Sequence, residues 1–216
     1  MNLKHSFTIN ECLCYISGMK RSKYVTLLEP LLAKPFFTAK EAKDRGIPTR
    51  MMAYFAQKGV VEPFGRGQYR VVDAVSGVDF ELEELVLTAC SIPRGVVCLI
   101  SALCFYNLTD QIMREYWIAV PNKDKKPKRA HTRIVRMRNM TLGVTQVTLA
   151  NFDLKIFDRE RTVVDAFRYL SHEIAVKALQ SYLKPSNNEK PNLAKLSEYA
   201  KALRVNITPY LTVLTT

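Results

Sequence analysis

The stretch from Phe37 to Val72 constrains the fold of this 216-residue chain more than any other part of the sequence. Thr38 followed three positions later by Glu41 is a capping-box pair, which begins a helix, and Gly46 ends that helix. Pro48 fits the first turn of a second helix, because a proline there gives up no helical hydrogen bond. These helix start and stop residues therefore predict two helices joined by a tight turn.

The residues after the second helix predict a short hairpin. Gly59 ends the helix, and Val60 to Phe64 and Gln68 to Val72 have the composition of strands. The Gly65-Arg66-Gly67 segment between them allows positive φ and leaves one arginine at the tip. Two helices followed by such a hairpin are typical of a winged helix-turn-helix, in which the second helix enters the major groove of DNA.

The second helix of this arrangement is amphipathic. Met51, Met52 and Phe55 form its apolar side, so that the opposite side remains for contact with base edges. Lysines of both helices are expected on phosphates, and the arginine of the hairpin is expected in the minor groove. The candidate DNA-binding residues are Lys40, Lys43, Thr49, Arg50, Ala53, Tyr54, Lys58 and Arg66.

Composition places the chain among ordinary folded proteins, with 48% hydrophobic and 24% charged residues. No apolar run approaches the length of a membrane span, the N-terminus lacks the features of a signal peptide, and five cysteines fit a reducing compartment. We therefore expect a cytoplasmic protein without a membrane partner. Cys12 and Cys14 could begin a metal site, but no second pair follows at zinc-finger spacing, so neither a metal nor another cofactor is expected.

The net charge of +12 is segregated along the chain. Residues 21–72 hold ten Lys or Arg against four Asp or Glu, whereas residues 73–122 hold two against seven. Residues 123–138 are again basic, with eight Lys or Arg and one Asp. Such clustering is typical of nucleic-acid binding, although a solvated loop explains the second cluster nearly as well. That candidate basic patch consists of Lys123, Lys125, Lys126, Lys128, Arg129, Arg133, Arg136 and Arg138.

The acidic stretch that begins at Asp73 marks the end of the first domain, and we place the boundary near Val75. We expect an N-terminal extension over residues 1–20, a winged helix-turn-helix domain over 21–75 and a mixed α+β domain over 76–216. In this last domain a helix opens around Leu82. Expected strands are 96–100, 115–120, 132–137, 144–149 and 154–157, and expected helices are 101–106, 161–170, 174–183 and 193–203.

The order of these motifs resembles the AbiEi-type antitoxins of abortive-infection operons. The resemblance rests on the winged segment, on Ser101-Ala102-Leu103 and on the run from Glu160 to Ala166, which contains Arg161, Thr162 and Asp165. It implies a transcriptional autorepressor that binds inverted repeats in its own promoter as double-stranded DNA. It also implies a C-terminal domain that counters a nucleotidyltransferase toxin encoded next door, as a type IV antitoxin without a stable complex.

Three residues near the start of the 161–170 helix have two interpretations. Arg159, Arg161 and Asp165 could form part of an antitoxin surface. Alternatively, Asp165 pairs with Arg161 or Arg168 within the helix, and we favour this pairing because such ion pairs are ordinary. Tyr116 and Trp117 are expected as sheet aromatics rather than a base-stacking platform, because aromatic and basic residues do not alternate here.

No nucleophile, phosphate-loop or metalloprotease motif is present, so we expect no enzyme. The nearest candidate is nuclease-like: Asp153-Leu154-Lys155 resembles half of a metal-dependent endonuclease site, but residues 132–149 lack the second carboxylate that such a site needs. A winged-helix metabolic repressor with a ligand pocket in residues 76–216 would share every DNA-binding feature. A neighbouring nucleotidyltransferase gene would favour the antitoxin over that repressor.

Overall fold

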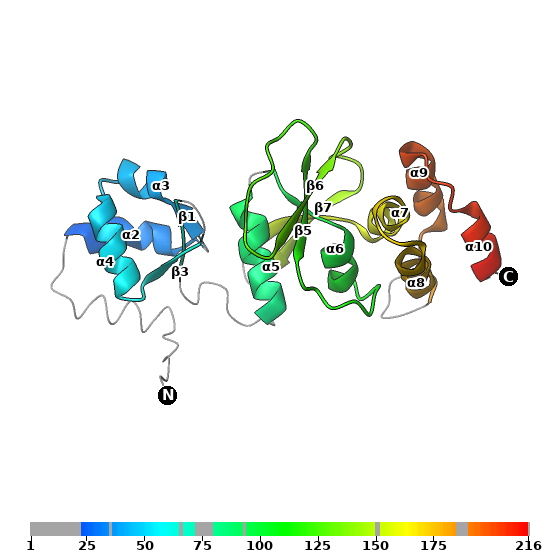
Figure 1. Cartoon of the computed structure of the whole chain (residues 1–216), viewed down its shortest axis with the longest axis horizontal. Coiled ribbons are helices and arrows are strands. Elements are labelled where there is room, and N and C mark those ends of the chain that lie inside the picture. Colours follow the sequence, from blue (N-terminus) through cyan, green and yellow to red (C-terminus); the bar gives the residue numbers. More distant parts are fainter. Residues whose placement is uncertain are drawn as a thin grey trace. The chain divides into compact units, whose positions relative to one another are not determined.

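The computed structural model describes residues 23–34, 36–64, 67–71, 80–92, 94–149, 152–184 and 190–215. Helices accompany two separate sheets (Figure 1), which confirms the predicted α+β class. The chain divides into two compact units, the first ending at Ser91 and also including the segment Leu149–Phe152. The predicted boundary near Val75 and the 1–20 extension lie outside the described residues.

The first unit contains helices on a small antiparallel sheet, whose strands lie in the order β1-β3-β2. Its core is formed by buried side chains such as Leu28, Phe37 and Val61. Neither α2 nor β1 was predicted from the sequence. The elements are α2 (Lys23–Leu32), β1 (Phe36–Thr38), α3 (Ala39–Asp44), α4 (Thr49–Gln57), β2 (Val61–Pro63), β3 (Gln68–Val71) and α5 (Phe80–Ser91).

The turn between α3 and α4 has the capping and turn residues that the sequence predicted. Thr38 and Glu41 form the capping box: the Glu41 N–H donates to the Thr38 hydroxyl over 3.1 Å, and the Thr38 N–H donates to the Glu41 carboxylate over 2.8 Å. Gly46 has a φ of +83°, and Ile47 is buried beside it. Pro48 differs slightly from expectation, because it is the N-cap of α4 and precedes the first turn.

Helix α5 belongs to the first unit, whereas the sequence placed it beyond the boundary. Arg70 of β3 explains the difference, because its guanidinium bonds Glu62 of β2 at 2.6 Å and Glu84 of α5 at 2.7 Å. The Gln68 side-chain amide also donates to the Ser91 carbonyl over 3.2 Å. These bonds tie α5 to the small sheet.

The second unit is built on a five-stranded sheet in the order β6-β5-β4-β8-β7. Strand β4 is antiparallel to β5 and parallel to β8, and β5 is parallel to β6, which confirms the mixed sheet. The elements are β4 (Val96–Val97), α6 (Leu99–Phe105), β5 (Tyr116–Pro121), β6 (Thr132–Met137), β7 (Val144–Leu149), β8 (Phe152–Phe157), α7 (Arg159–Tyr169), α8 (His172–Leu183), α9 (Leu193–Leu203) and α10 (Thr208–Thr215).

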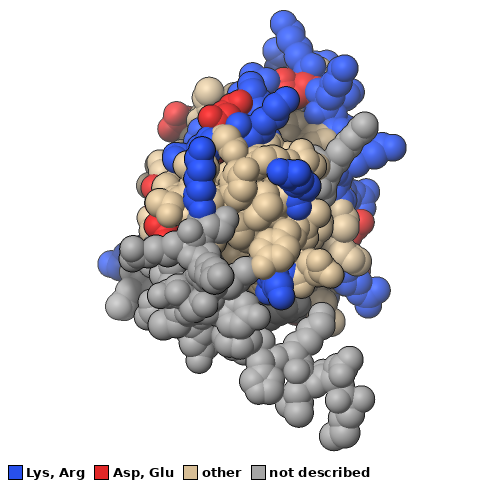
Figure 2. Space-filling view, turned by 90° about the vertical axis from the view of Figure 1, so that its left-hand side faces the viewer, with Lys and Arg blue, Asp and Glu red and all other residues tan. Residues whose placement is uncertain are grey.

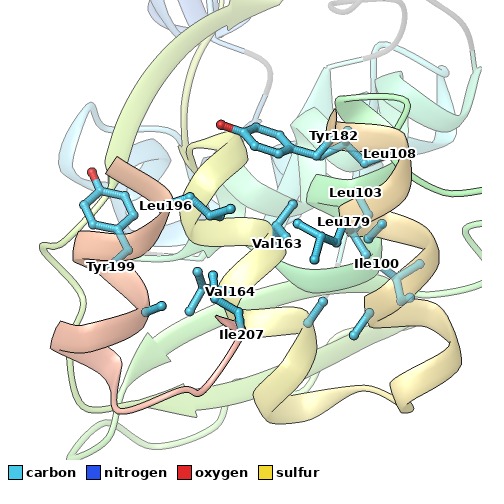
Figure 3. Packing of buried hydrophobic residues seen from close by; sticks show 14 residues of the cluster. Ile100, Leu103, Leu108, Val163, Val164, Leu179, Tyr182, Leu196, Tyr199 and Ile207 are labelled. Atoms are coloured by element: carbon cyan, nitrogen blue, oxygen red, sulfur yellow. The ribbon is translucent and has the colours of Figure 1, made fainter. Parts of the chain in front are cut away.

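Helix α7 is the centre of the helical layer of this unit and contacts α6, α8 and α9. Figure 3 shows side chains of these helices converging, with Val163 and Val164 of α7 between Leu179 of α8 and Leu196 of α9. All four of these side chains are completely buried. The apolar periodicity of residues 161–203 therefore predicted this core.

Candidate nucleic-acid interface

Helix α4 presents a polar side to solvent above an apolar side in the core. Met52 and Phe55 are each 1% exposed, whereas Thr49 and Arg50 are exposed at the start of the helix. Pro48 offers no side chain to the first N–H groups of α4. The positive end of the helix dipole and an arginine thus lie together, an arrangement that attracts phosphate.

The remaining predicted residues of the first unit lie on α3 and further along α4. Lys40 and Lys43 are exposed on α3, as are Ala53 on α4 and Lys58 at the C-cap of α4. Tyr54 is half-buried, and the Lys58 ammonium lies 5.9 Å from its ring centre. In the view of Figure 2, Lys and Arg side chains spread around the described surface, with Asp and Glu side chains interspersed among them. Arg66 lies outside the described residues.

The second candidate surface is the loop that joins β5 to β6, together with β6 itself. Its only acidic residue is Asp124, and both carboxylate oxygens of Asp124 accept hydrogen bonds from the Arg94 guanidinium at 2.7 Å. The negative charge of Asp124 is thus paired with Arg94 and does not offset the positive charge of the neighbouring lysines. Arg129 is half-buried. The other seven residues of the predicted basic patch are exposed: Lys123, Lys125, Lys126, Lys128, Arg133, Arg136 and Arg138.

The basic patch does not form one continuous face. Arg133 and Arg136 are three residues apart on β6, and since side chains alternate along a strand they point to opposite faces of the sheet. The Arg133 guanidinium lies over Trp117 of β5, 4.3 Å from the ring centre, and 4.0 Å from the Glu115 carboxylate. Arg136 lies on the other face. The cations of β6 are therefore divided between the two faces of the sheet.

The structure contradicts the predicted antitoxin surface, because two of its three residues, Arg161 and Asp165, are buried. Arg161 is 0% exposed and Asp165 is 1% exposed, and the two form an ion pair of 2.7 Å within α7. The other Arg161 nitrogens donate to the carbonyls of Leu142 at 3.0 Å and Asn139 at 3.1 Å. These two residues cannot face a partner, and the alternative interpretation, an intrahelical pair, is confirmed.

The neighbouring motif residues also have structural roles. Arg168 pairs with the second oxygen of Asp165 at 2.8 Å. The Thr162 hydroxyl donates to the Phe157 carbonyl, and the Ser101 hydroxyl accepts from the Trp117 N–H at 2.8 Å, which fixes β5 to α6. Of the three proposed surface residues only Arg159 is partly exposed, with its guanidinium 5.2 Å from the Tyr182 ring centre.

A polar cluster at the start of α7 was not predicted from the sequence. Lys195 of α9 lies 3.0 Å from Asp158 and 3.2 Å from Glu160, and Tyr182 donates to Glu160 over 2.8 Å. Burial alone would lower the pKa of Lys195, but hydrogen bonds and charge from Asp158 and Glu160 raise it. Burial and Glu160 raise the pKa of Tyr182. Lys195 therefore stays charged, Tyr182 stays neutral, and the cluster fastens α9 to α7 and α8.

The two polar residues of the nuclease-like motif, Asp153 and Lys155, lie exposed on β8, and Leu154 between them is buried. Asp153 accepts a hydrogen bond of 2.6 Å from Thr148, and Lys155 points into solvent. Within the described ranges, no group of three or more His, Cys, Asp or Glu side chains could hold a metal ion. Cys12 and Cys14 fall outside those ranges. Among the helices that the structure describes, none combines the length and apolarity required to cross a bilayer.

Comparison with known proteins adds no assignment. No family model matches the chain, and no curated protein matches it. The resemblance to AbiEi-type antitoxins consequently rests on the order of the sequence motifs.

Proposed function

We propose that the first unit is a winged helix-turn-helix that binds double-stranded DNA. The observation that carries this proposal is helix α4, whose exposed Arg50 and Thr49 stand at an N-terminus without a side-chain cap while Met52 and Phe55 hold the helix in the core. In such domains the N-terminal residues of the second helix contact base edges. Lys40, Lys43 and Lys58 then contact phosphates, and Arg66 reaches the minor groove.

Gel-shift titrations of two variants test this division of roles. Arg50→Ala should cost about 1 to 3 kcal/mol on operator DNA and relax sequence preference, because alanine cannot hydrogen-bond a base edge as arginine does. Lys58→Ala is the matched control, since it removes one exposed cation from the same helix and should weaken operator and scrambled duplexes alike. Equal reductions in affinity for both duplexes with Arg50→Ala would contradict base reading.

We further propose that the protein is a cytoplasmic, non-enzymatic type IV antitoxin and autorepressor. It would bind inverted repeats in its own promoter and oppose a nucleotidyltransferase toxin without a stable complex. The support is the ordered resemblance to AbiEi-type antitoxins, together with a charge distribution suited to DNA. Full-length Arg50→Ala, expressed with the toxin encoded next to it, should lose repression and still rescue growth. If this variant fails to rescue growth, protection from the toxin is explained by transcriptional shut-off alone.

A further inference from the structure

The second unit contains an open hollow of about 520 Å³ beside the start of β5. It is bounded by Ile100 of α6, by residues of the 110–115 loop and by Trp117. Ligand pockets in proteins commonly measure about 300 to 1,000 Å³. The hollow is therefore large enough for one nucleotide.

The aromatic wall of the hollow carries a stacked arginine. Trp117 lines the hollow, and the Arg133 guanidinium lies 4.3 Å from its ring centre. Unpaired nucleic-acid bases stack on aromatic rings and on arginine planes. Trp117 and Arg133 are far apart in sequence, but the parallel register of β5 and β6 places them directly opposite each other. Trp117 is thus a sheet aromatic with a stacked cationic partner, which the sequence pattern did not indicate.

The polar groups of the hollow suit the other parts of a nucleotide. Asp110 and Glu115 supply exposed carboxylates, which accept hydrogen bonds from amino groups on bases. Arg114 is exposed and forms no ion pair in the part of the chain that the structure describes, so its guanidinium remains for a phosphate. Cytosine, adenine and guanine carry an exocyclic amino group, whereas uracil carries a carbonyl where cytosine carries its amino group.

Two arginines supply positive charge at the hollow itself. Arg114 lines the hollow and Arg133 stacks on its Trp117 wall, whereas Lys123 and Lys125 lie beside Pro121, at the other end of β5. Aromatic stacking combined with positive charge is how proteins bind single strands, so a strand with one base in the hollow can place a flanking phosphate on Arg114.

We propose that this hollow binds an unpaired nucleotide whose base carries an exocyclic amino group, with the base on the Trp117–Arg133 pair and the phosphate on Arg114. The nucleotide is either free or part of a single strand. The site lies in the second unit and requires neither α4 nor duplex DNA, so it goes beyond the proposed DNA binding.

Trp117 is the only tryptophan of the chain, so its fluorescence reports on the hollow directly. The full-length protein is titrated with CMP, UMP, oligocytidylate and oligouridylate. Cytidine ligands should quench saturably and bind about tenfold more tightly than the uridine ligands, which corresponds to about 1.4 kcal/mol. Tighter binding of the oligonucleotide than of CMP identifies a single strand as the ligand, and equal affinities identify the free nucleotide.

Two arginines of β6 provide the matched pair of variants. Arg133→Ala should weaken cytidine binding about tenfold, whereas Arg136→Ala, which removes the same charge from the opposite face, should weaken it at most about threefold. Circular dichroism verifies that both variants are folded. The proposal is overturned if no ligand quenches saturably, if cytidine and uridine ligands bind equally, or if both variants lose affinity equally.

Discussion

At the scale of single residues, Arg161 shows how a buried charge organises the second unit. Its guanidinium joins Asp165 of α7 to two carbonyls of the loop between β6 and β7. Gly143 of that loop has a φ of +69°, and a Cβ built there would lie 2.7 Å from the Arg161 Cβ. The loop can therefore approach α7 this closely only with glycine at that position.

Removing Arg161, which is buried, should destabilise the protein far more than removing Arg168, the more exposed arginine that pairs with the same Asp165. Arg161→Ala leaves Asp165 buried without its principal counter-charge, which costs about 3 to 5 kcal/mol. Arg168→Ala, the control, removes a partly exposed guanidinium from the same carboxylate and should cost about 1 kcal/mol or less. Urea denaturation measures both free energies of unfolding, and similar small decreases would refute the role of Arg161.

At the scale of elements, the capping box of α3 couples stability to pH. The hydrogen bond from Lys34 is the main cause that lowers the pKa of Glu41, and the Thr38 N–H and hydroxyl add to it. A carboxylate with a lowered pKa stabilises the fold above its unfolded value, about 4.3, and this contribution disappears as the pH falls through the folded pKa.

Glu41→Gln should therefore be less stable than the natural chain near neutral pH, by about 1 kcal/mol or less, and the difference should shrink at about pH 3. Thr38→Ala, which removes the other half of the box, should cost about 1 kcal/mol. Thermal denaturation at both pH values provides the comparison. A gap between Glu41→Gln and the natural chain that stays constant with pH would show that the Glu41 charge does not contribute.

Local patterns predicted the elements that are specified locally. The box at Thr38 and the bounds of β6, β7 and α9 followed from capping, turn residues and periodicity. Strand β1 was missed because its three residues exist as a strand only through pairing with β3. Strand β4 was expected to extend to Ile100, but Leu99 has a φ of +49° and begins α6.

Within the candidate sites, too, the features that depend on local sequence were predictable and those that depend on distant residues were not. The exposed side of α4 follows from helical periodicity, so Arg50 and Lys58 could be placed from the sequence. The burial of Arg161 could not, because it depends on carbonyls of residues 139 and 142, which are distant in sequence. Trp117 and Arg133 meet only through the register of parallel strands.

At the scale of the whole molecule, the net charge of +12 is carried largely by two basic segments, one in each unit. In the second unit Arg94 neutralises Asp124, so the loop between β5 and β6 keeps the charge of its lysines. The winged helix-turn-helix that we propose for the first unit is a single module, and such a module buries little DNA surface, so a second contact would add to its affinity. The loop is the natural candidate for that contact.

Neutralising Lys125, Lys126, Lys128 and Arg129 together should therefore weaken operator binding and reduce the salt slope by about 0.9 for each phosphate that is no longer neutralised, because fewer counterions are released. Titrations at several salt concentrations measure this, and rescue from the toxin is scored with the same variant. Unchanged operator binding with failed rescue would assign the loop to the antitoxin activity and to a polyanion other than the operator. If neither property changes, the loop is a solvated surface and the proposed second contact is wrong.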